Sequence, residues 1–132
     1  MDHSVAEQPA AERNRQVVQR LFELALHGAV AGALDLVADD YVEHSPVIPA
    51  GKQGLGEFLR TLAGQAARPE VTVHRVIADD EHAVVHYHSR IGPEDPGSAV
   101  ADIFRLRGGV IVEHWDVVQP LAQAAPDAKP VF

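Results

Sequence analysis

The second half of the chain contains four segments rich in Val, Ile, Tyr and Phe, with only short turns between them. The segments span residues 71–78, 82–91, 99–107 and 110–119. The turn-forming stretches ADDE, GPEDPGS and GG separate them. Because β-branched and aromatic residues favour strands, and clusters of Gly, Pro and Asp favour turns, this pattern predicts a β-meander.

The first half of the chain shows helical periodicity instead. Over residues 12–27, apolar side chains recur at helical spacing, and Gly28 is a natural stop. A second, shorter helix is expected to carry Leu34 and Val37 and to end near Asp39. Two helices are therefore expected early in the chain, well before the meander.

A loop and a third helix complete the first half. Tyr41 and Val42 can form a brief extended stretch, after which two prolines and Gly51 enforce a loop. The third helix is expected to end before residues 68–69, the Arg-Pro pair. Its apolar stripe consists of Leu55, Phe58, Leu59 and Leu62.

Helices followed by a meander predict an α+β domain in which three N-terminal helices pack on one face of a curved antiparallel β-sheet. A chain of 132 residues with 46% hydrophobic composition fits one domain with a single core. We expect this domain to span residues 12–120. The flanks at residues 1–11 and 121–132 are rich in Ala, Pro and Gln, and we expect them to be loosely ordered.

Composition excludes several classes of function. The net charge of −8 and the absence of any Lys or Arg run argue against nucleic acid and against an anionic membrane as partners. The chain has no cysteine, which excludes disulfides, zinc–thiolate sites and thiol nucleophiles. Neither a secretory signal nor an apolar run of membrane-spanning length is visible, so we expect a cytoplasmic protein.

The last hairpin decides which charged residues can meet. If residues 107–109 form a three-residue loop, Leu106 pairs with Val110, and Asp102 lies opposite His114. Asp102 and His114 then share one face of the sheet, and the other members of that face are Phe104, Asp116 and Val118.

A two-residue loop would instead place Asp102 with Glu113 and Trp115, because a slip of one residue exchanges the faces. We favour the first register. In that register Trp115 lies opposite to the pocket and is expected to pack in a sheet-to-sheet or dimer contact. A position at the sheet edge or a salt bridge to Arg90 would be the alternative explanation for Asp102.

Three further histidines are candidates for a pocket. His44 lies between the short extended stretch and the proline loop, where a side chain can project into a cavity or remain on the surface. His86 and His88 share one strand face, a spacing that chelates a metal if a third ligand arrives. We favour two neutral histidines that line a polar cavity or a dimer face, and we expect no bound metal.

Two stretches, YVEHSPVIPAGKQGLGEFL and VADIFRLRGGVIVEHWDVVQP, resemble the SnoaL-like branch of the NTF2-like superfamily. This branch includes polyketide cyclases and predicted aldol-condensation-catalysing enzymes, and the wider superfamily includes ketosteroid isomerase, scytalone dehydratase and limonene-epoxide hydrolase. The resemblance covers about residues 12–120 and implies an NTF2-like (cystatin-like) cone with an internal pocket. Because this fold hosts many reactions, the resemblance indicates the fold better than the chemistry.

The resemblance also implies roles for individual residues. His44 falls where ketosteroid isomerase has its general-base aspartate, and Asp102 falls on the aspartic acid that donates to the oxyanion. Asp116 falls on the acid/base aspartate of the polyketide cyclases. In such proteins the positions of Asp102 and Asp116 both face the pocket, which supports the three-residue loop.

These observations lead to one functional hypothesis and one alternative. The hypothesis is an enzyme without an organic cofactor that transfers protons on a small, apolar or aromatic carbonyl substrate, and enolisation leads to isomerisation, aldol-type cyclisation or dehydration. The alternative is a non-catalytic ligand-binding or dimerisation module. In either case we expect a homodimer through the outer sheet face. The predicted catalytic residues are His44, Asp102, His114 and Asp116, and the predicted pocket residues are Tyr41, Phe58, His86, His88, Phe104 and Val118.

Overall fold

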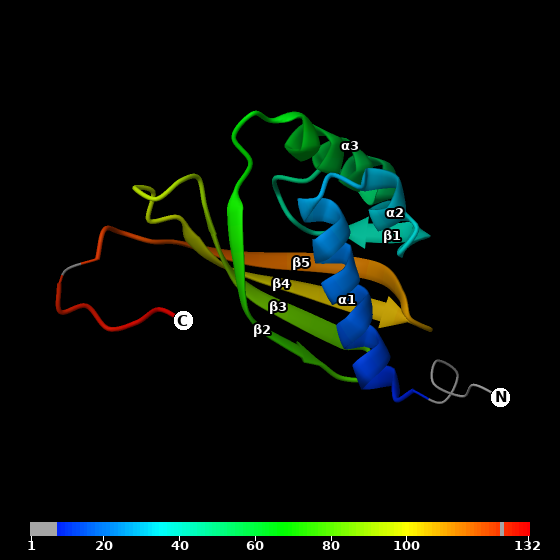
Figure 1. Cartoon of the computed structure of the whole chain (residues 1–132). Helices are drawn as coiled ribbons and strands as arrows, with labels where there is room; N and C mark the ends of the chain where they lie inside the picture. Colours follow the sequence, from blue (N-terminus) through cyan, green and yellow to red (C-terminus); the bar gives the residue numbers. More distant parts are fainter. Residues whose placement is uncertain (1–7, 125) are drawn as a thin grey trace.

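A computed structural model describes residues 8–124 and 126–132 of the chain, so part of the predicted flank at residues 1–11 lies outside the described residues. Figure 1 shows helices arranged against a strongly curved sheet. Each predicted strand of the meander is confirmed to within one residue at either end. The elements are α1 (Ala10–Leu26), α2 (Val30–Leu34), β1 (Val37–Glu43), α3 (Gly51–Gly64), β2 (Glu70–Ala78), β3 (His82–Arg90), β4 (Ser98–Arg107) and β5 (Val110–Pro120).

The sheet has five strands in the order β1-β5-β4-β3-β2. The strands β2 to β5 form the expected antiparallel meander. The prediction of a wholly antiparallel sheet is wrong, because β1 pairs with β5 in parallel. The long connection from β1 through α3 to β2 allows β1 to lie beside the last strand, so distant parts of the chain meet at this edge.

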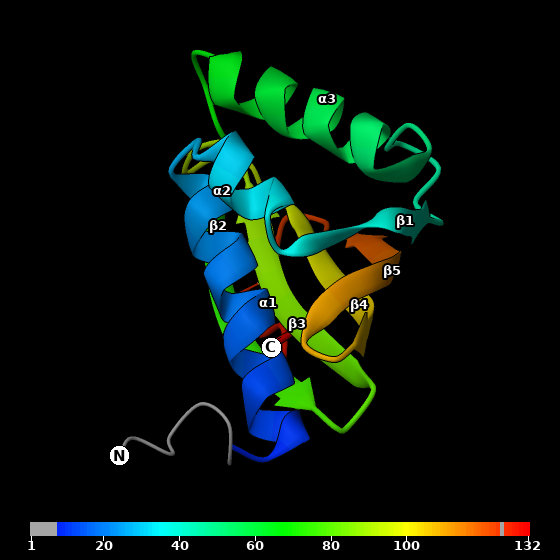
Figure 2. The ribbon, with the colours of Figure 1, turned by 90° about the vertical axis from the view of Figure 1, so that its right-hand side faces the viewer.

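The helices cover the concave side of the sheet (Figure 2). α1 packs against β2 and β3, α3 packs against β1, and α2 contacts both of these helices. Their apolar faces and the inner sheet face form one core, in which Val18 and Ile111 are fully buried. Within residues 8–124 and 126–132, no helix combines the length and the hydrophobicity that a bilayer crossing requires.

The second helix is shorter than predicted. It ends at Leu34, and Val37 begins β1 instead of continuing the helix. Val37 pairs with Ile111 of β5, and its side chain is only 3% exposed. A β-branched residue buried beside a neighbouring strand favours the extended conformation, so tertiary pairing overrides the local helical periodicity.

The hairpin between β4 and β5 has neither of the two registers that were considered from the sequence. Its loop has two residues, Gly108 and Gly109, which both have positive φ angles, as a type I′ turn requires. Beyond the turn, the pairing skips Val112 in β5, and this bulge shifts the register. Asp102 therefore pairs with Asp116, not with His114. The shared inner face is nevertheless confirmed, because the bulge brings His114 back to the side of Asp102.

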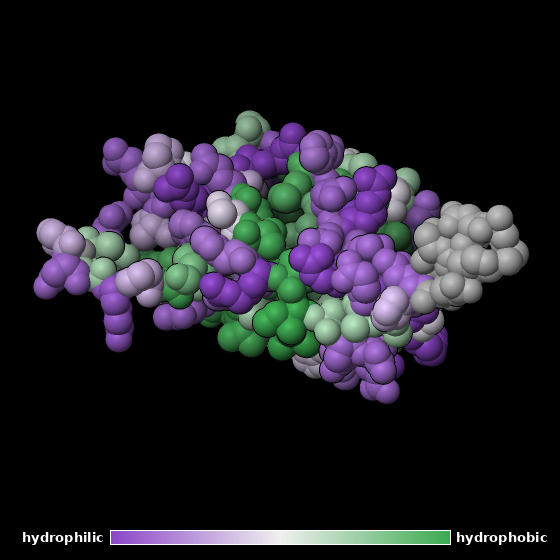
Figure 3. Space-filling view, turned by 60° about the horizontal axis from the view of Figure 1, so that its bottom comes forward, coloured by the Kyte–Doolittle hydropathy of each residue, from purple (hydrophilic) through white to green (hydrophobic). Residues whose placement is uncertain are grey.

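The outer face of the sheet exposes apolar side chains. Ile77 and Val117 are 62% and 60% exposed, and both pair with residues on the face opposite Asp102. Seen from below, the molecule shows a hydrophobic band near its middle with hydrophilic residues on either side (Figure 3). A homodimer through the outer sheet face stays a prediction that this exposed apolar surface favours.

Candidate active site

A cavity of about 200 Å³ lies between the helices and the inner face of the sheet. Its walls are mainly apolar, and the predicted pocket residues Tyr41, Phe58 and Phe104 line it. Two of the predicted catalytic residues, Asp102 and His114, also line it. The remaining lining residues are Leu21, Phe22, Ala25, Leu26, Val37, Ile48, Leu55, Leu59, Leu62, Arg68, Pro69, Val71, Tyr87, Ser89 and Ile111.

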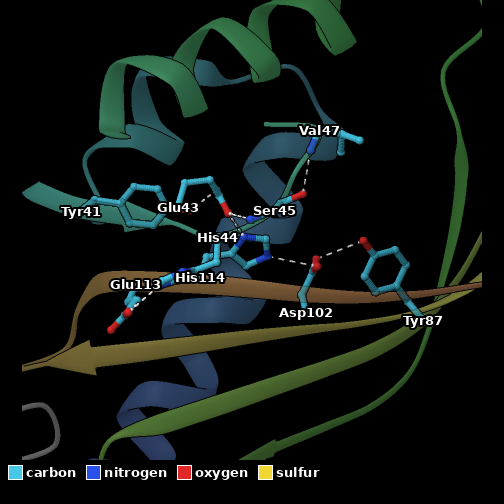
Figure 4. A network of polar contacts seen from close by, with 9 residues as sticks. All are labelled: Tyr41, Glu43, His44, Ser45, Val47, Tyr87, Asp102, Glu113 and His114. Carbon is cyan, nitrogen blue, oxygen red and sulfur yellow. Dashed lines mark hydrogen bonds and ion pairs between the residues drawn. The ribbon is translucent and has the colours of Figure 1, made fainter. Parts of the chain in front are cut away.

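His114 lies between two carboxylates on the inner face of β5 (Figure 4). Its Nδ1 is 2.6 Å from Oε2 of Glu43, and its Nε2 is 3.1 Å from Oδ1 of Asp102. Because ionised carboxylates only accept hydrogen bonds, both ring nitrogens act as donors, and the ring is an imidazolium. The side chains of His114 and Glu43 are 7% and 0% exposed, so this ion cluster is buried.

Two tyrosines extend the cluster. The Tyr41 hydroxyl donates to Oε1 of Glu43 at 2.5 Å, and the backbone N–H of Ser45 donates to Oε2 at 3.0 Å. The Tyr87 hydroxyl donates to Oδ2 of Asp102 at 3.0 Å. Each carboxylate therefore receives at least two hydrogen bonds, which compensate for its removal from water.

The environment sets the charge of each group. Burial opposes protonation of His114, but the hydrogen bonds and charges of Asp102 and Glu43 outweigh it and raise the pKa of His114 to about 9. Burial also works against the ionised form of Glu43, but hydrogen bonds from His114, Tyr41 and Ser45 lower the pKa of this carboxyl below its usual value. At neutral pH both groups are therefore charged.

Burial raises the pKa values of Tyr41 and Tyr87 well above the ordinary value, and the nearby carboxylates raise them further. Both hydroxyls therefore remain protonated and act as hydrogen-bond donors. The charge of Asp116 contributes to both shifts, so this half-buried residue lies near the cluster, although it does not line the cavity.

The groups of the cluster differ in their access to a ligand. Glu43 is fully buried behind His114, and both ring nitrogens of His114 are already hydrogen-bonded. Asp102 lines the cavity, and each of its oxygens retains a lone pair beyond the bonds from His114 and Tyr87. Asp102 is therefore the group best placed to exchange a proton with a bound molecule, and the hydrogen bond from His114 positions its carboxyl group.

The prediction that His44 enters the pocket is wrong. Its ring stacks on Trp115 at a centroid distance of 4.9 Å, and its Nε2 donates to Oε2 of Glu113 at 2.6 Å. Arg105 also donates to Glu113 at 2.7 Å, so these residues form a cluster on the outer face. Side chains alternate between faces along a strand, and His44 follows Glu43, which faces inward. The outward orientation predicted for Trp115 is confirmed, and Glu113 shares it.

Sequence reasoning missed Glu43, although a signal for it was available. Tyr41 is predicted to line the pocket, and residues two apart on a strand share a face. The same extended stretch would therefore have placed Glu43 inward and His44 outward, if it had been continued by two residues.

Three other predicted pocket residues do not line the cavity. His86 pairs with Ala101, which precedes Asp102 on β4, so His86 faces outward. His88 shares that face and donates from Nε2 to the carbonyl of Pro96 at 2.8 Å. Val118 shares the strand face of His114, but it is 51% exposed beyond the cavity. Among the described residues, no three His, Asp or Glu side chains are placed to hold a metal ion.

Several solved structures share this fold. A candidate ketosteroid isomerase from Kribbella flavida aligns with a TM-score of 0.75 at 18% identity, over 94% of this chain and 93% of its own. An NTF2-like protein of unknown function from Burkholderia xenovorans aligns with a TM-score of 0.71 at 15% identity, over 92% and 97%. An LEH-like epoxide hydrolase from M. tuberculosis aligns with a TM-score of 0.69 at 17% identity, over 84% and 86%.

These likenesses establish an NTF2-like, cone-like α+β fold, with a mixed five-stranded sheet and three helices over the described residues. None of the curated proteins compared with the chain matches it. The family model for the SnoaL-like domain matches residues 18–114, which is well over half of the chain. The chain therefore belongs to the SnoaL-like domain family.

Proposed function

We propose that this protein is an acid–base enzyme that abstracts a proton from the carbon next to a carbonyl group. The substrate is a small, largely apolar carbonyl compound. One observation supports the proposal most strongly: the carboxyl group of Asp102, which accepts hydrogen bonds from His114 and Tyr87, borders a mainly apolar cavity. A carboxylate in such a site is removed from bulk water, so its interactions with a bound molecule are strong.

In the proposed reaction, Asp102 accepts the proton from the carbon, and the electron pair of the C–H bond moves onto the carbonyl oxygen as an enolate. Once protonated, Asp102 is a poorer acceptor for the Tyr87 hydroxyl, which can turn to donate to the enolate oxygen. Throughout this step His114 stays cationic, with Glu43 compensating its charge on the far side.

The fate of the enolate depends on the substrate. Return of the proton from Asp102 to a different carbon is an isomerisation, and loss of a β-hydroxyl group as water is a dehydration. Attack on a second carbonyl of the same molecule is an aldol-type cyclisation, the reaction of the polyketide cyclases that this family includes. The structural likeness to a candidate ketosteroid isomerase is compatible with the first of these outcomes. All of these outcomes share the initial proton transfer to Asp102.

The proposal is tested by solvent exchange. The purified protein is incubated in D₂O with a panel of cyclic ketones and diketones, and deuterium at the carbon next to the carbonyl is measured by NMR. We expect exchange well above that in protein-free buffer for at least one ketone. If no ketone exchanges faster than in buffer, the cavity is better explained as the site of a non-catalytic binding module.

A further inference from the structure

The cavity has a second polar end, away from Asp102. Arg68 lies between α3 and β2 and lines the cavity, as does Ser89 of β3. Asp102 pairs with Val85 of β3, and Ser89 lies four residues farther along that strand. At the rise of a β-strand this corresponds to about 13 Å. Arg68 is exposed, so this end of the cavity reaches the surface.

Arg68 has no carboxylate partner among residues 8–124 and 126–132. Its only hydrogen bond there is a long one, 3.5 Å from Nη1 to the carbonyl of Leu26. Arginines elsewhere in the structure do form ion pairs, for example Arg90 with Glu70 and Arg107 with Asp40. In a chain with a net charge of −8, a cation without such a partner beside an apolar cavity is available to an anionic ligand.

The two ends of the cavity differ in charge. The end of the cavity at Asp102, which we call the deep end, holds the cluster described above. This cluster combines the carboxylates of Glu43 and Asp102 with the single imidazolium of His114, so its net charge is negative. An anionic group is therefore repelled from the deep end and attracted to Arg68. A guanidinium also matches a carboxylate geometrically, because it can donate two parallel hydrogen bonds. The negative cluster and the positive Arg68 would together orient a ligand that has a carboxylate at one end, so that this carboxylate lies at Arg68.

We propose that the cavity binds an elongated, mainly apolar keto acid, whose carboxylate pairs with Arg68 while its ketone lies beside Asp102 and Tyr87. The position of the ketone rests on the proposed function, whereas the carboxylate subsite does not. The cavity volume of about 200 Å³ lies below the usual range for ligand pockets, so the keto acid is small. Arg68 then selects acids over their neutral esters.

The test compares an acid with its ester. The acid is an oxooctanoic acid whose ketone is a methyl ketone at the end away from the carboxylate, and the ester is its methyl ester. Calorimetry measures the binding of each ligand to the wild type, to Arg68→Gln and to Arg60→Gln. Arg60 is the matched control, because it is exposed on α3 and does not line the cavity. Arg68→Gln is expected to weaken binding of the acid about tenfold, the effect of losing a charged hydrogen bond, and to leave the ester unchanged.

Two results would overturn this assignment. In the first, the wild type binds the ester as tightly as the acid. In the second, Arg68→Gln weakens both ligands equally, which would mean that Arg68 only packs against the ligand. Arg68→Lys is expected to restore part of the preference for the acid, because it keeps the charge without the forked geometry.

Since these measurements need no turnover, they separate the subsite from the chemistry. An acid preference that depends on Arg68, together with no deuterium exchange into the bound acid, supports the subsite and contradicts the proposed function. Exchange into simple ketones without any preference for the acid supports the function and contradicts the subsite.

Discussion

Replacing Asp102 with asparagine is expected to slow deuterium exchange into a ketone by about 10²–10⁴-fold, the usual contribution of a general base. The amide keeps the size of the carboxylate and can still accept a hydrogen bond from His114, but it cannot take a proton from carbon. The rate is measured by NMR in D₂O, with wild type and Asp102→Asn at equal concentration. Near-UV circular dichroism is the check that both proteins are folded.

Two control variants sharpen this experiment. Asp40→Asn removes an exposed carboxylate that pairs with Arg107 away from the cavity, and His44→Gln removes the histidine of the outer face. Both are expected to retain the wild-type exchange rate. A wild-type rate in Asp102→Asn would exclude Asp102 as the base. A loss in His44→Gln as large as that in Asp102→Asn would contradict the separation of His44 from the site.

Stability should fall steeply as the pH rises above neutrality. The pKa of His114 is about 9 in the folded protein and 6.5 when unperturbed, so the folded state binds this proton more tightly. The resulting stabilisation is complete below pH 6.5 and is lost as the pH rises through 9. Its size is on the order of 3 kcal/mol in the free energy of unfolding. Urea denaturation at a series of pH values measures it.

His114→Gln removes the titrating group and is expected to flatten this pH dependence. Glu43→Gln is a second variant that keeps the imidazole but removes one partner, so the loss of stability should begin at lower pH and be smaller. The contribution of Glu43 to stability has the opposite pH dependence. Because folding lowers the pKa of this carboxyl, its stabilisation is fully present above the ordinary pKa of 4.5 and is lost as the pH falls below that value. A wild-type stability that is constant from neutral pH to pH 9 would contradict the buried imidazolium.

The meander and the meeting of Asp102 with His114 could be predicted from the sequence because they depend on local signals. Alternating apolar residues and glycine turns define the strands, and residues of two adjacent strands face each other over a short loop. The predicted faces proved right even though the loop length was wrong. A bulge at Val112 compensates for the shorter loop and keeps His114 on the face of Asp102. No local sequence pattern in β5 indicates that bulge.

Strand β1 could not be predicted in the same way. The partner of β1 is β5, which is about seventy residues away in the sequence and pairs with it in parallel. The length of β1, and which of its side chains point inward, therefore depend on tertiary contacts. The family resemblance placed a base at His44, one residue from the buried Glu43. On a strand, a shift of one residue moves a side chain to the other face, which explains why the resemblance pointed to a residue of the outer face that adjoins one of the buried cluster.

A buried imidazolium at His114 donates a hydrogen bond to Asp102 at the cavity wall, and the nitrogen chemical shifts of His114 report directly on its protonation. The measurement uses protein labelled with ¹⁵N-histidine, titrated from about pH 6 to about pH 10, with assignment by the His114→Gln spectrum. Both nitrogens of His114 should remain protonated at neutral pH and titrate together at a pKa of about 9. A neutral ring at pH 7, with one protonated and one unprotonated nitrogen, would show that His114 is not an imidazolium.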